Sequence, residues 1–313
     1  MTTTTQLHAS IEQQLQTAKL PTLPAIAVNL ITLGRSASAN IDTLTEIVSQ
    51  DPAIAANLVR LANSALYHRG NPAETLTKAT SRLGFERSRV IAMSATVLPA
   101  MRSVAVQGLP YSEYWRRSLI AGAIAREICR RLSPDDVEAT FLAAMLQDIG
   151  ILLLAQLSDN PYSGVSTDAY THEAAIECER RLFKQDHGAV GAWWLEQWGF
   201  PARFVAAVRL SNIPGIAPPR AEQDGFSGLV RAAGLLADLW MGEELSQRLV
   251  SRQSEVSRIL GMDWQEIVQL VAAASSEIPL VEALCDVQIS DVKNLQLALM
   301  TLRELPAPEP DVC

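Results

Sequence analysis

Residues that start and end helices recur along the whole 313-residue sequence, and the segments between them carry apolar residues at helical spacing. After Asp51-Pro52, for example, Ile54, Leu58 and Leu61 fall on one face of a helix. The strong helix formers alanine and leucine account for 43 and 40 residues, whereas aromatic residues make up only 5%. No convincing alternation of apolar and polar residues predicts a strand. The sequence therefore predicts an all-α protein with at least ten helices and no sheet of three or more strands.

The pair Asp51-Pro52 is a clear helix start. An aspartate at this position accepts the free N–H groups of the first turn, and the following proline has no N–H group to leave unpaired. We therefore expect Asp51 to cap a helix that runs to about Asn63.

Charge and hydropathy exclude several classes of protein. With 26 basic and 34 acidic residues the formal net charge is −8, which argues against a general nucleic-acid-binding protein. No apolar run approaches the ~20 residues that a membrane-spanning helix requires, and residues 1–5 lack the profile of a signal peptide. The four cysteines lie far apart without a CxxC pair, as is typical of reduced thiols. We expect a cytoplasmic protein that binds neither nucleic acid nor a membrane.

The helical pattern breaks around residues 106–110 and resumes at Tyr111. We therefore divide the chain into an N-terminal helical part, residues 1–108, and a larger helical bundle, residues 109–305. The last residues, 306–313, contain closely spaced prolines that prevent a helix, and we expect a disordered tail.

Candidate metal ligands are few. The chain has four histidines, His8, His68, His172 and His187, and only His187 opens a helix beside an apolar stripe. His172 lies in a Thr-His-Glu segment that resembles a helix start. One usable histidine is too few for a metal centre, which needs several side chains from different helices. Motifs for a nucleophile or a phosphate loop are also missing, so the residues alone predict no catalytic group and no cofactor.

Two blocks of sequence carry a family resemblance. The first consists of LPTLP at 20–24, QDPAIA at 50–55, LANSA at 61–65 and LG at 83–84; the second consists of YWRRS at 114–118, FLAAMLQDIG at 141–150 and DHGAVGA at 186–192. In order and spacing, over roughly residues 20–240, these blocks resemble the HDOD family of bacterial regulatory domains, relatives of the HD metal-dependent phosphohydrolases. The resemblance implies an HD-like multi-helix bundle with an N-terminal helical subdomain.

The same resemblance identifies a degenerate pocket. Arg117 stands where a competent HD site has its first histidine, and Gln147-Asp148 stands where it has the His-Asp doublet. His187 matches a ligand position and is retained. The fold of the family implies that Arg117, Gln147, Asp148 and His187 converge in one pocket.

This pocket is expected to hold no metal and to have no phosphohydrolase activity. Glutamine is a poor substitute for imidazole on a transition metal, and the permanently charged guanidinium of Arg117 repels a dication. The last aspartate of an HD site falls near Gly234, with Asp238 one turn further on. Without a metal, the simplest expectation is that Asp148, His187 and Arg117 pair with one another.

For function, the resemblance implies a non-enzymatic signal-transduction regulator in a bacterial cytoplasm, which binds another signalling protein and is linked to two-component or cyclic-dinucleotide signalling. Two alternatives stay open. The pocket could sense a nucleotide, with Arg117 holding a phosphate, or it could retain metal-dependent phosphohydrolase activity. The sequence indicates neither the partner nor the oligomeric state.

Asn63-Ser64 is expected to form a helix C-terminal cap with a local turn, and the edge formed by Asn63, Ser64 and Tyr67 is a candidate partner surface. Trp193 is the other candidate. Trp194 and Trp198 share a helical face and are expected in the core, whereas Trp193 points elsewhere and is expected to be partly exposed.

Overall fold

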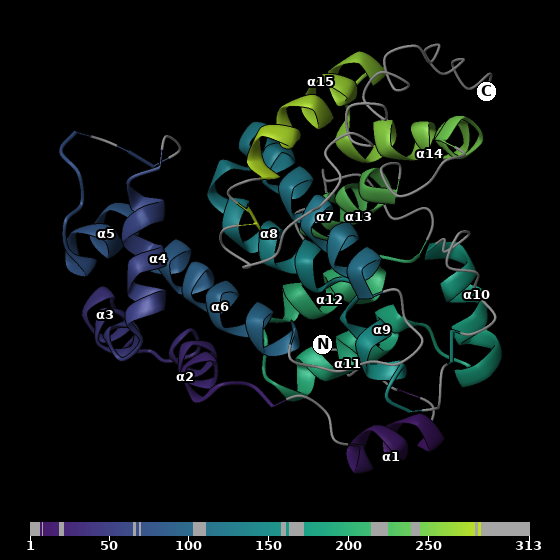
Figure 1. Cartoon of the computed structure of the whole chain (residues 1–313), viewed down its shortest axis with the longest axis horizontal. Coiled ribbons are helices and arrows are strands. Elements are labelled where there is room, and N and C mark those ends of the chain that lie inside the picture. Colours follow the sequence, from purple (N-terminus) through teal and green to yellow (C-terminus); the bar gives the residue numbers. More distant parts are fainter. Residues whose placement is uncertain are drawn as a thin grey trace.

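The fold is given by a computed structural model that describes residues 7, 9–18, 22–64, 67–68, 70–102, 111–157, 161–162, 172–213, 225–238, 245–278 and 281–282. Within these ranges the chain forms fifteen α-helices, two short 3-10 helices and no β-strand, so the all-α prediction is confirmed (Figure 1). The helices are α1 (Ala9–Thr17), α2 (Ala25–Leu33), α3 (Ile41–Ser49), α4 (Pro52–Ala62), α5 (Leu76–Leu83), α6 (Phe85–Arg102), α7 (Tyr111–Leu132), η1 (Pro134–Asp136), α8 (Val137–Leu146), α9 (Ile149–Leu154), α10 (His172–Phe183), α11 (His187–Gln197), α12 (Ala202–Leu210), α13 (Gly225–Asp238), α14 (Leu245–Leu260), α15 (Trp264–Ala274) and η2 (Ser275–Glu277).

Helices α2 to α5 form a group at one end of the molecule, and α6 runs from this group towards the rest (Figure 1). All four of these helices pack against α6, which in turn contacts α8 of the larger group. The predicted boundary near residue 108 lies outside the described residues, and so does the predicted tail at 306–313.

The larger group is built around α7, which packs against α8, α13 and α15, while α11 packs against α9 and α12. Every residue of α8 and α9 is buried. The segment Pro134–Leu154 is long and apolar enough to cross a membrane, but the whole of its apolar window is buried inside the protein. It therefore forms the core helices of this bundle, interrupted by a turn at Gln147-Asp148.

Asp51 caps α4 as predicted. Its Oδ1 accepts the backbone N–H groups of Ala53 at 2.9 Å and Ile54 at 3.2 Å, and Pro52 is the first residue of the helix. The helix ends at Ala62, and Asn63 is its C-terminal cap.

The expectation of a partly exposed Trp193 is wrong. The residue is only 5% exposed and belongs to the hydrophobic core, because α11 packs against both α9 and α12. Trp194 and Trp198 do share a face, with ring centroids 4.1 Å apart.

Candidate functional site

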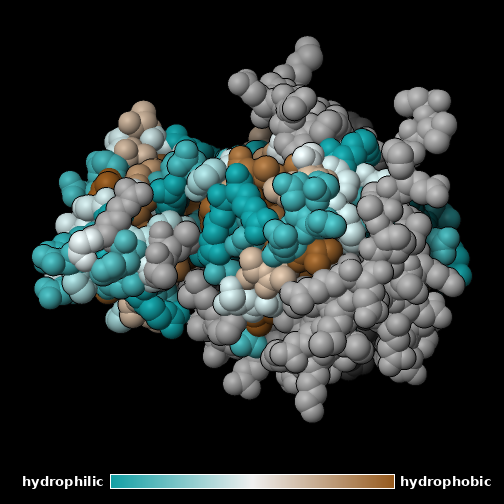
Figure 2. Space-filling view, turned by 90° about the horizontal axis from the view of Figure 1, so that it is seen from above, coloured by the Kyte–Doolittle hydropathy of each residue, from teal (hydrophilic) through white to brown (hydrophobic). Residues whose placement is uncertain are grey.

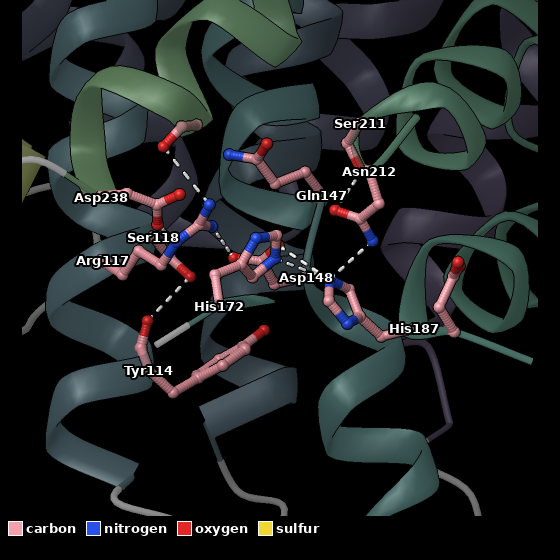
Figure 3. A network of polar contacts seen from close by, with 12 residues as sticks. Tyr114, Arg117, Ser118, Gln147, Asp148, His172, His187, Ser211, Asn212 and Asp238 are labelled. Carbon is pink, nitrogen blue, oxygen red and sulfur yellow. Dashed lines mark hydrogen bonds and ion pairs between the residues drawn. The ribbon is translucent and has the colours of Figure 1, made fainter. Parts of the chain in front are cut away.

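A buried network of polar side chains, called the pocket below, lies where α7, α11, α13 and the turn between α8 and α9 meet (Figure 3). Arg117 comes from α7, Gln147 and Asp148 form the turn, and His187 is the first residue of α11. The structure brings Arg117, Asp148 and His187 into one network, and Gln147 lies next to it. The break between α8 and α9 matters because it places two adjacent polar residues at the pocket within an otherwise apolar segment.

Arg117 binds two carboxylates from different parts of the fold. Its Nε donates to Oδ1 of Asp238 at 2.6 Å, and its Nη1 pairs with Oδ2 of Asp148. Nη2 donates to the backbone carbonyl of Gly234 at 3.3 Å, and Asp238 is also paired with Arg252. The planar guanidinium suits this position because its N–H groups point in fixed directions. Of the two positions considered for the last aspartate, Asp238 therefore supplies the carboxylate and Gly234 a carbonyl.

His172 also lies in this pocket, although the sequence does not predict it there. It is the first residue of α10, and its Nε2 lies 2.8 Å from Nε2 of His187 and 3.2 Å from Oδ1 of Asp148. Nε2 of His187 lies 3.4 Å from the same oxygen. In the sequence, only the imidazole of His172 marks it as a possible ligand, because nothing in the spacing of the helices indicates which side chains of α10 face the pocket.

The opposite nitrogen of His187 is held by a buried carboxylate. Oε2 of Glu179 lies 2.7 Å from Nδ1 of His187 and also accepts the backbone N–H of His187 at 2.8 Å. Tyr162 donates its hydroxyl to Oε1 of Glu179 at 2.8 Å. On the pocket side, Nδ2 of Asn212 lies 2.8 Å from Nε2 of His187. Glu179 and Tyr162 were both missed from the sequence, because each supports the pocket from a different helix or loop.

Gln147 contributes less to the network than its neighbour Asp148. Its side chain is buried and donates from Nε2 to the carbonyl of Ala144 at 3.0 Å. A Cβ atom at Gly234 would collide with the amide oxygen of Gln147, so the absence of a side chain at Gly234 makes room for this amide.

Both carboxylates bound by Arg117 are ionised at neutral pH. Burial alone would raise the pKa of Asp148, but the guanidinium of Arg117 and the nearby His172 hold this pKa well below its ordinary value. Asp238 is affected in the same way, and its pKa is lowered despite its burial because Arg117 and Arg252 flank it.

The two histidines shift in opposite directions. Burial and the charge of Arg117 lower the pKa of His172. Burial acts in the same sense on His187, but Glu179 at its Nδ1 and the nearby Asp148 outweigh that effect and raise its pKa. Without a metal ion, the arrangement therefore favours a neutral His172 beside a protonated His187.

Only some of the side chains in this pocket can bind a metal ion. Arg117 cannot be a ligand, because a guanidinium has no lone pair to offer. Asp148, His172 and His187, by contrast, offer three ligand atoms that all lie within 4.8 Å of one another. The expectation of a pocket without metal rested on the lost ligands at Arg117 and Gln147, on the charge of Arg117 and on a single usable histidine, whereas the structure gathers two histidines.

The residues predicted to contact a partner make contacts within the chain. Asn63 donates to the carbonyl of Ala73 at 2.9 Å and accepts its N–H at 2.7 Å, and Ser64 donates to the carbonyl of Leu61. The hydroxyl of Tyr67 donates to Glu138 of α8 at 2.7 Å, which links the N-terminal helices to the larger group. All three residues remain partly exposed.

The exposed large hydrophobic residues are spread over the described surface. Figure 2 shows mostly hydrophilic side chains over the N-terminal helices, on the left. Val28 of α2, Leu132 of α7, Leu182 of α10 and Ile213 after α12 are the large hydrophobic side chains exposed within the described ranges.

Comparison with known proteins identifies one family and one shared fold. The family model of the HDOD domain matches residues 20–214. A solved HDOD domain protein of unknown function from Geobacter sulfurreducens is 22% identical, with a TM-score of 0.65 over 88% of this chain and 96% of that chain. A protein from Shewanella amazonensis SB2B, provisionally named a phosphohydrolase, is 22% identical with a TM-score of 0.63 over 89% of this chain and 97% of its own. A protein from Marinobacter aquaeolei VT8, provisionally named a signal transduction protein, is 22% identical with a TM-score of 0.60 over 89% of this chain and 66% of its own. No curated protein matches the sequence. At these identities, the structures establish the shared fold.

Proposed function

Because this chain belongs to the HDOD family, we propose that it is a regulatory signal-transduction protein that acts by binding another signalling protein and has no phosphohydrolase activity. The family model covers more than half of the chain, including the pocket residues Arg117, Asp148 and His187. The fold is shared with proteins that carry phosphohydrolase names, so the proposal depends on what this chain has at the positions where an HD enzyme binds metal.

The observation that carries the proposal is the double ion pair of Arg117 with Asp148 and Asp238. By the resemblance, Arg117 replaces a histidine ligand, and the two aspartates are carboxylates that an HD hydrolase would use to hold its ions. A dication 4 Å from the guanidinium would be repelled by about 8 kcal/mol at an effective dielectric constant of 20, which is about 4 kcal/mol for each unit of its charge. The two-ion arrangement of a hydrolase is therefore disfavoured by both ligand loss and charge.

The nucleotide-sensor alternative gains no support from this network. A sensor would need the guanidinium of Arg117 for a phosphate group, but Nε and Nη1 of Arg117 already pair with Asp238 and Asp148. Releasing them would leave Asp148 without its guanidinium partner and Asp238 with Arg252 alone in a largely buried place, which is costly.

The partner and the compartment follow from the family resemblance. We place the protein in the bacterial cytoplasm and its partner among the proteins of two-component or cyclic-dinucleotide signalling. The contact surface we propose is the partly exposed edge at Asn63, Ser64 and Tyr67, beside which His68 is exposed.

A hydrolysis assay tests the enzymatic part of the proposal. Purified protein is incubated with Mn²⁺, Fe²⁺ or Zn²⁺ and with cyclic dinucleotides or bis(p-nitrophenyl) phosphate, and Asp148→Asn serves as the matched control. We expect the wild-type rate to equal that of the variant. Turnover that is lost in Asp148→Asn would contradict the proposal and favour the phosphohydrolase alternative.

Cross-linking in the native cells tests the partner surface. The tagged chain is compared with His68→Glu, at the proposed edge, and with Val28→Glu, an exposed substitution on α2. We expect the wild type and Val28→Glu to capture the same signalling protein and His68→Glu to lose it. Equal capture by both variants would place the contact elsewhere.

A further inference from the structure

Three ligand atoms converge on one point of the pocket: Oδ1 of Asp148, Nε2 of His172 and Nε2 of His187 (Figure 3). We propose that these three residues bind a single divalent transition-metal ion, for which Zn²⁺ is the best match. The ligand set departs from the pattern of the HD enzymes, because Arg117 and Gln147 take no part and His172 of α10 is added.

The distances between the three atoms match those around one ion. They are 2.8 Å between the two imidazole nitrogens and 3.2 and 3.4 Å from each nitrogen to the carboxylate oxygen. Ligand bonds of about 2.0–2.2 Å place the ligand atoms of a tetrahedral zinc ion roughly 3–3.5 Å apart. An ion at this bond length from Asp148, His172 and His187 therefore lies just outside the plane of the three atoms, with little movement of the side chains.

His187 is oriented as a metal ligand by its other nitrogen. Glu179 lies 2.7 Å from Nδ1 and is itself held by the hydroxyl of Tyr162, so the proton of a neutral imidazole is directed to Nδ1. The lone pair of Nε2 then points at Asp148 and His172. A carboxylate behind a ligating histidine is the usual way in which proteins fix the ring and increase its basicity.

The charges of the pocket permit one ion and disfavour two. Three carboxylates, those of Asp148, Asp238 and Glu179, face two guanidinium groups, those of Arg117 and Arg252. One negative charge is left over, so a single dication brings the total to +1, whereas a second would bring it to +3. The two oxygens of Asp148 are divided accordingly, since Oδ2 faces Arg117 and Oδ1 faces the histidines.

Asn212 supplies a candidate for the fourth ligand. Its Nδ2 lies 2.8 Å from Nε2 of His187, at the edge of the three-atom cluster. Turning this amide by 180° exchanges its nitrogen for its oxygen, which is a suitable ligand for a divalent cation. Imidazole nitrogens with carboxylate and carbonyl oxygens form a borderline ligand set, and zinc accepts such sets in tetrahedral geometry.

Ion binding would tie α10 to the core of the bundle. His172 is the first residue of α10, whereas Asp148 and His187 belong to the adjoining turn and to α11. The ion thus joins three segments that are separate in sequence, and its loss would release the start of α10 from the pocket.

Zinc titration of the metal-free protein tests the site. The protein, with Cys285→Ser and Cys313→Ser to remove stray thiol ligands, is titrated with Zn²⁺ in competition with a chromophoric chelator, and Co²⁺ is used as a spectroscopic substitute. We expect one ion per chain at micromolar Zn²⁺ and the visible absorption of tetrahedral cobalt. His172→Gln should bind at least 100-fold more weakly, and Glu179→Gln about 10- to 100-fold more weakly.

His68→Gln is the matched control, because His68 is exposed at a distance along the chain from the pocket and should leave the affinity unchanged. The inference is overturned by the absence of a one-to-one complex at micromolar Zn²⁺, or by a His172→Gln variant that binds like the wild type. The outcome of this titration can be distinguished from the outcome of the hydrolysis assay that tests the proposed function. A bound ion without hydrolysis supports both, whereas a bound ion with hydrolysis that depends on Asp148 supports the site and contradicts the proposed function.

Discussion

The side chain of Arg117 donates from Nε to Oδ1 of Asp238 at 2.6 Å, so the N-terminal half of α7 is joined to the last residue of α13 by a largely buried ion pair. The same guanidinium reaches the turn between α8 and α9 through Asp148. One cation therefore holds three parts of the bundle that a metal ion would hold in an HD enzyme. Part of the positive charge that balances the carboxylates of the pocket is built into the chain at this position.

Replacing Arg117 by methionine should strongly destabilise the protein, because it leaves Asp148 and Asp238 without this cation. We expect a loss of about 3–5 kcal/mol in the free energy of unfolding, measured by denaturation in urea. Lys78→Met is the control, since the exposed pair of Lys78 with Glu74 contributes at most about 1 kcal/mol. Equal losses in the two variants would show that the ion pairs of Arg117 do not stabilise the fold.

Gly150 allows α9 and α11 to pack at close range. A Cβ atom at this position would collide with the backbone carbonyl of His187 and would crowd the backbone nitrogen of Gly191. Because backbone atoms cannot move aside, Gly150→Ala should cost about 3 kcal/mol or more. Gly122→Ala is the control: its Cβ would meet the side chains of Met145 and Phe141, which can change conformation, and a smaller loss is expected. Thermal and urea denaturation of both variants distinguish the two cases.

The sequence predicted the elements well because their signals are local. Asp51 marks the start of α4 by its own chemistry, and the apolar spacing after it predicts the helix without knowledge of any other segment. The same local signals did not predict the burial of Trp193. Its position on α11 indicates the direction of the side chain, but its burial depends on α9 and α12, which come from elsewhere in the chain.

The pocket shows the same division between local and long-range information. The family resemblance identified Arg117, Asp148 and His187 because motif positions carry them. His172 matches no such position, and its approach to His187 depends on how α10 packs beside α11. Glu179 illustrates the point most clearly, because a glutamate within a helix is ordinarily exposed and only the structure shows it buried against His187.

Asp51→Ala should reduce stability by about 1 kcal/mol, because it removes the acceptor for two backbone N–H groups at the start of α4. Asp42→Ala is a suitable comparison. Asp42 lies in the first turn of α3, where Asn40 provides the cap, so its removal should cost only a few tenths of a kcal/mol. A midpoint of urea denaturation that is unchanged in Asp51→Ala would contradict the role of the cap.

Tyr67→Phe tests the link between the N-terminal helices and the larger group. It removes a hydrogen bond of 2.7 Å to the carboxylate of Glu138, and a bond to a charged group contributes about 1.5–3 kcal/mol. Tyr111→Phe removes a bond to the carbonyl of Arg102, a neutral acceptor, and should cost about 1 kcal/mol. A loss for Tyr67→Phe that does not exceed that for Tyr111→Phe would mean that the link to Glu138 adds little.

The stability contributed by Glu277 should depend on pH. Its carboxylate accepts from Nη2 of Arg130 at 2.6 Å and from Nε of Arg126 at 3.3 Å, and Arg126 is fully buried. Burial alone would raise the pKa of Glu277, but the hydrogen bonds and charges of the two arginines outweigh it and lower this pKa below the ordinary value.

A lowered pKa in the folded state means that the unfolded chain takes up the proton first as the pH falls. The stabilisation is therefore fully present above the pKa of the unfolded state, about 4.3 for a glutamate, and is lost as the pH falls through the folded-state pKa. Wild type should exceed Glu277→Gln in unfolding free energy at pH 7, and the difference should shrink steadily in acid. Urea denaturation across this range measures it, with Glu74→Gln, at an exposed pair with Lys78, as the control expected to differ little from wild type at any pH. A difference for Glu277→Gln that stays constant with pH would show that the ionised carboxylate is not the source of the stabilisation.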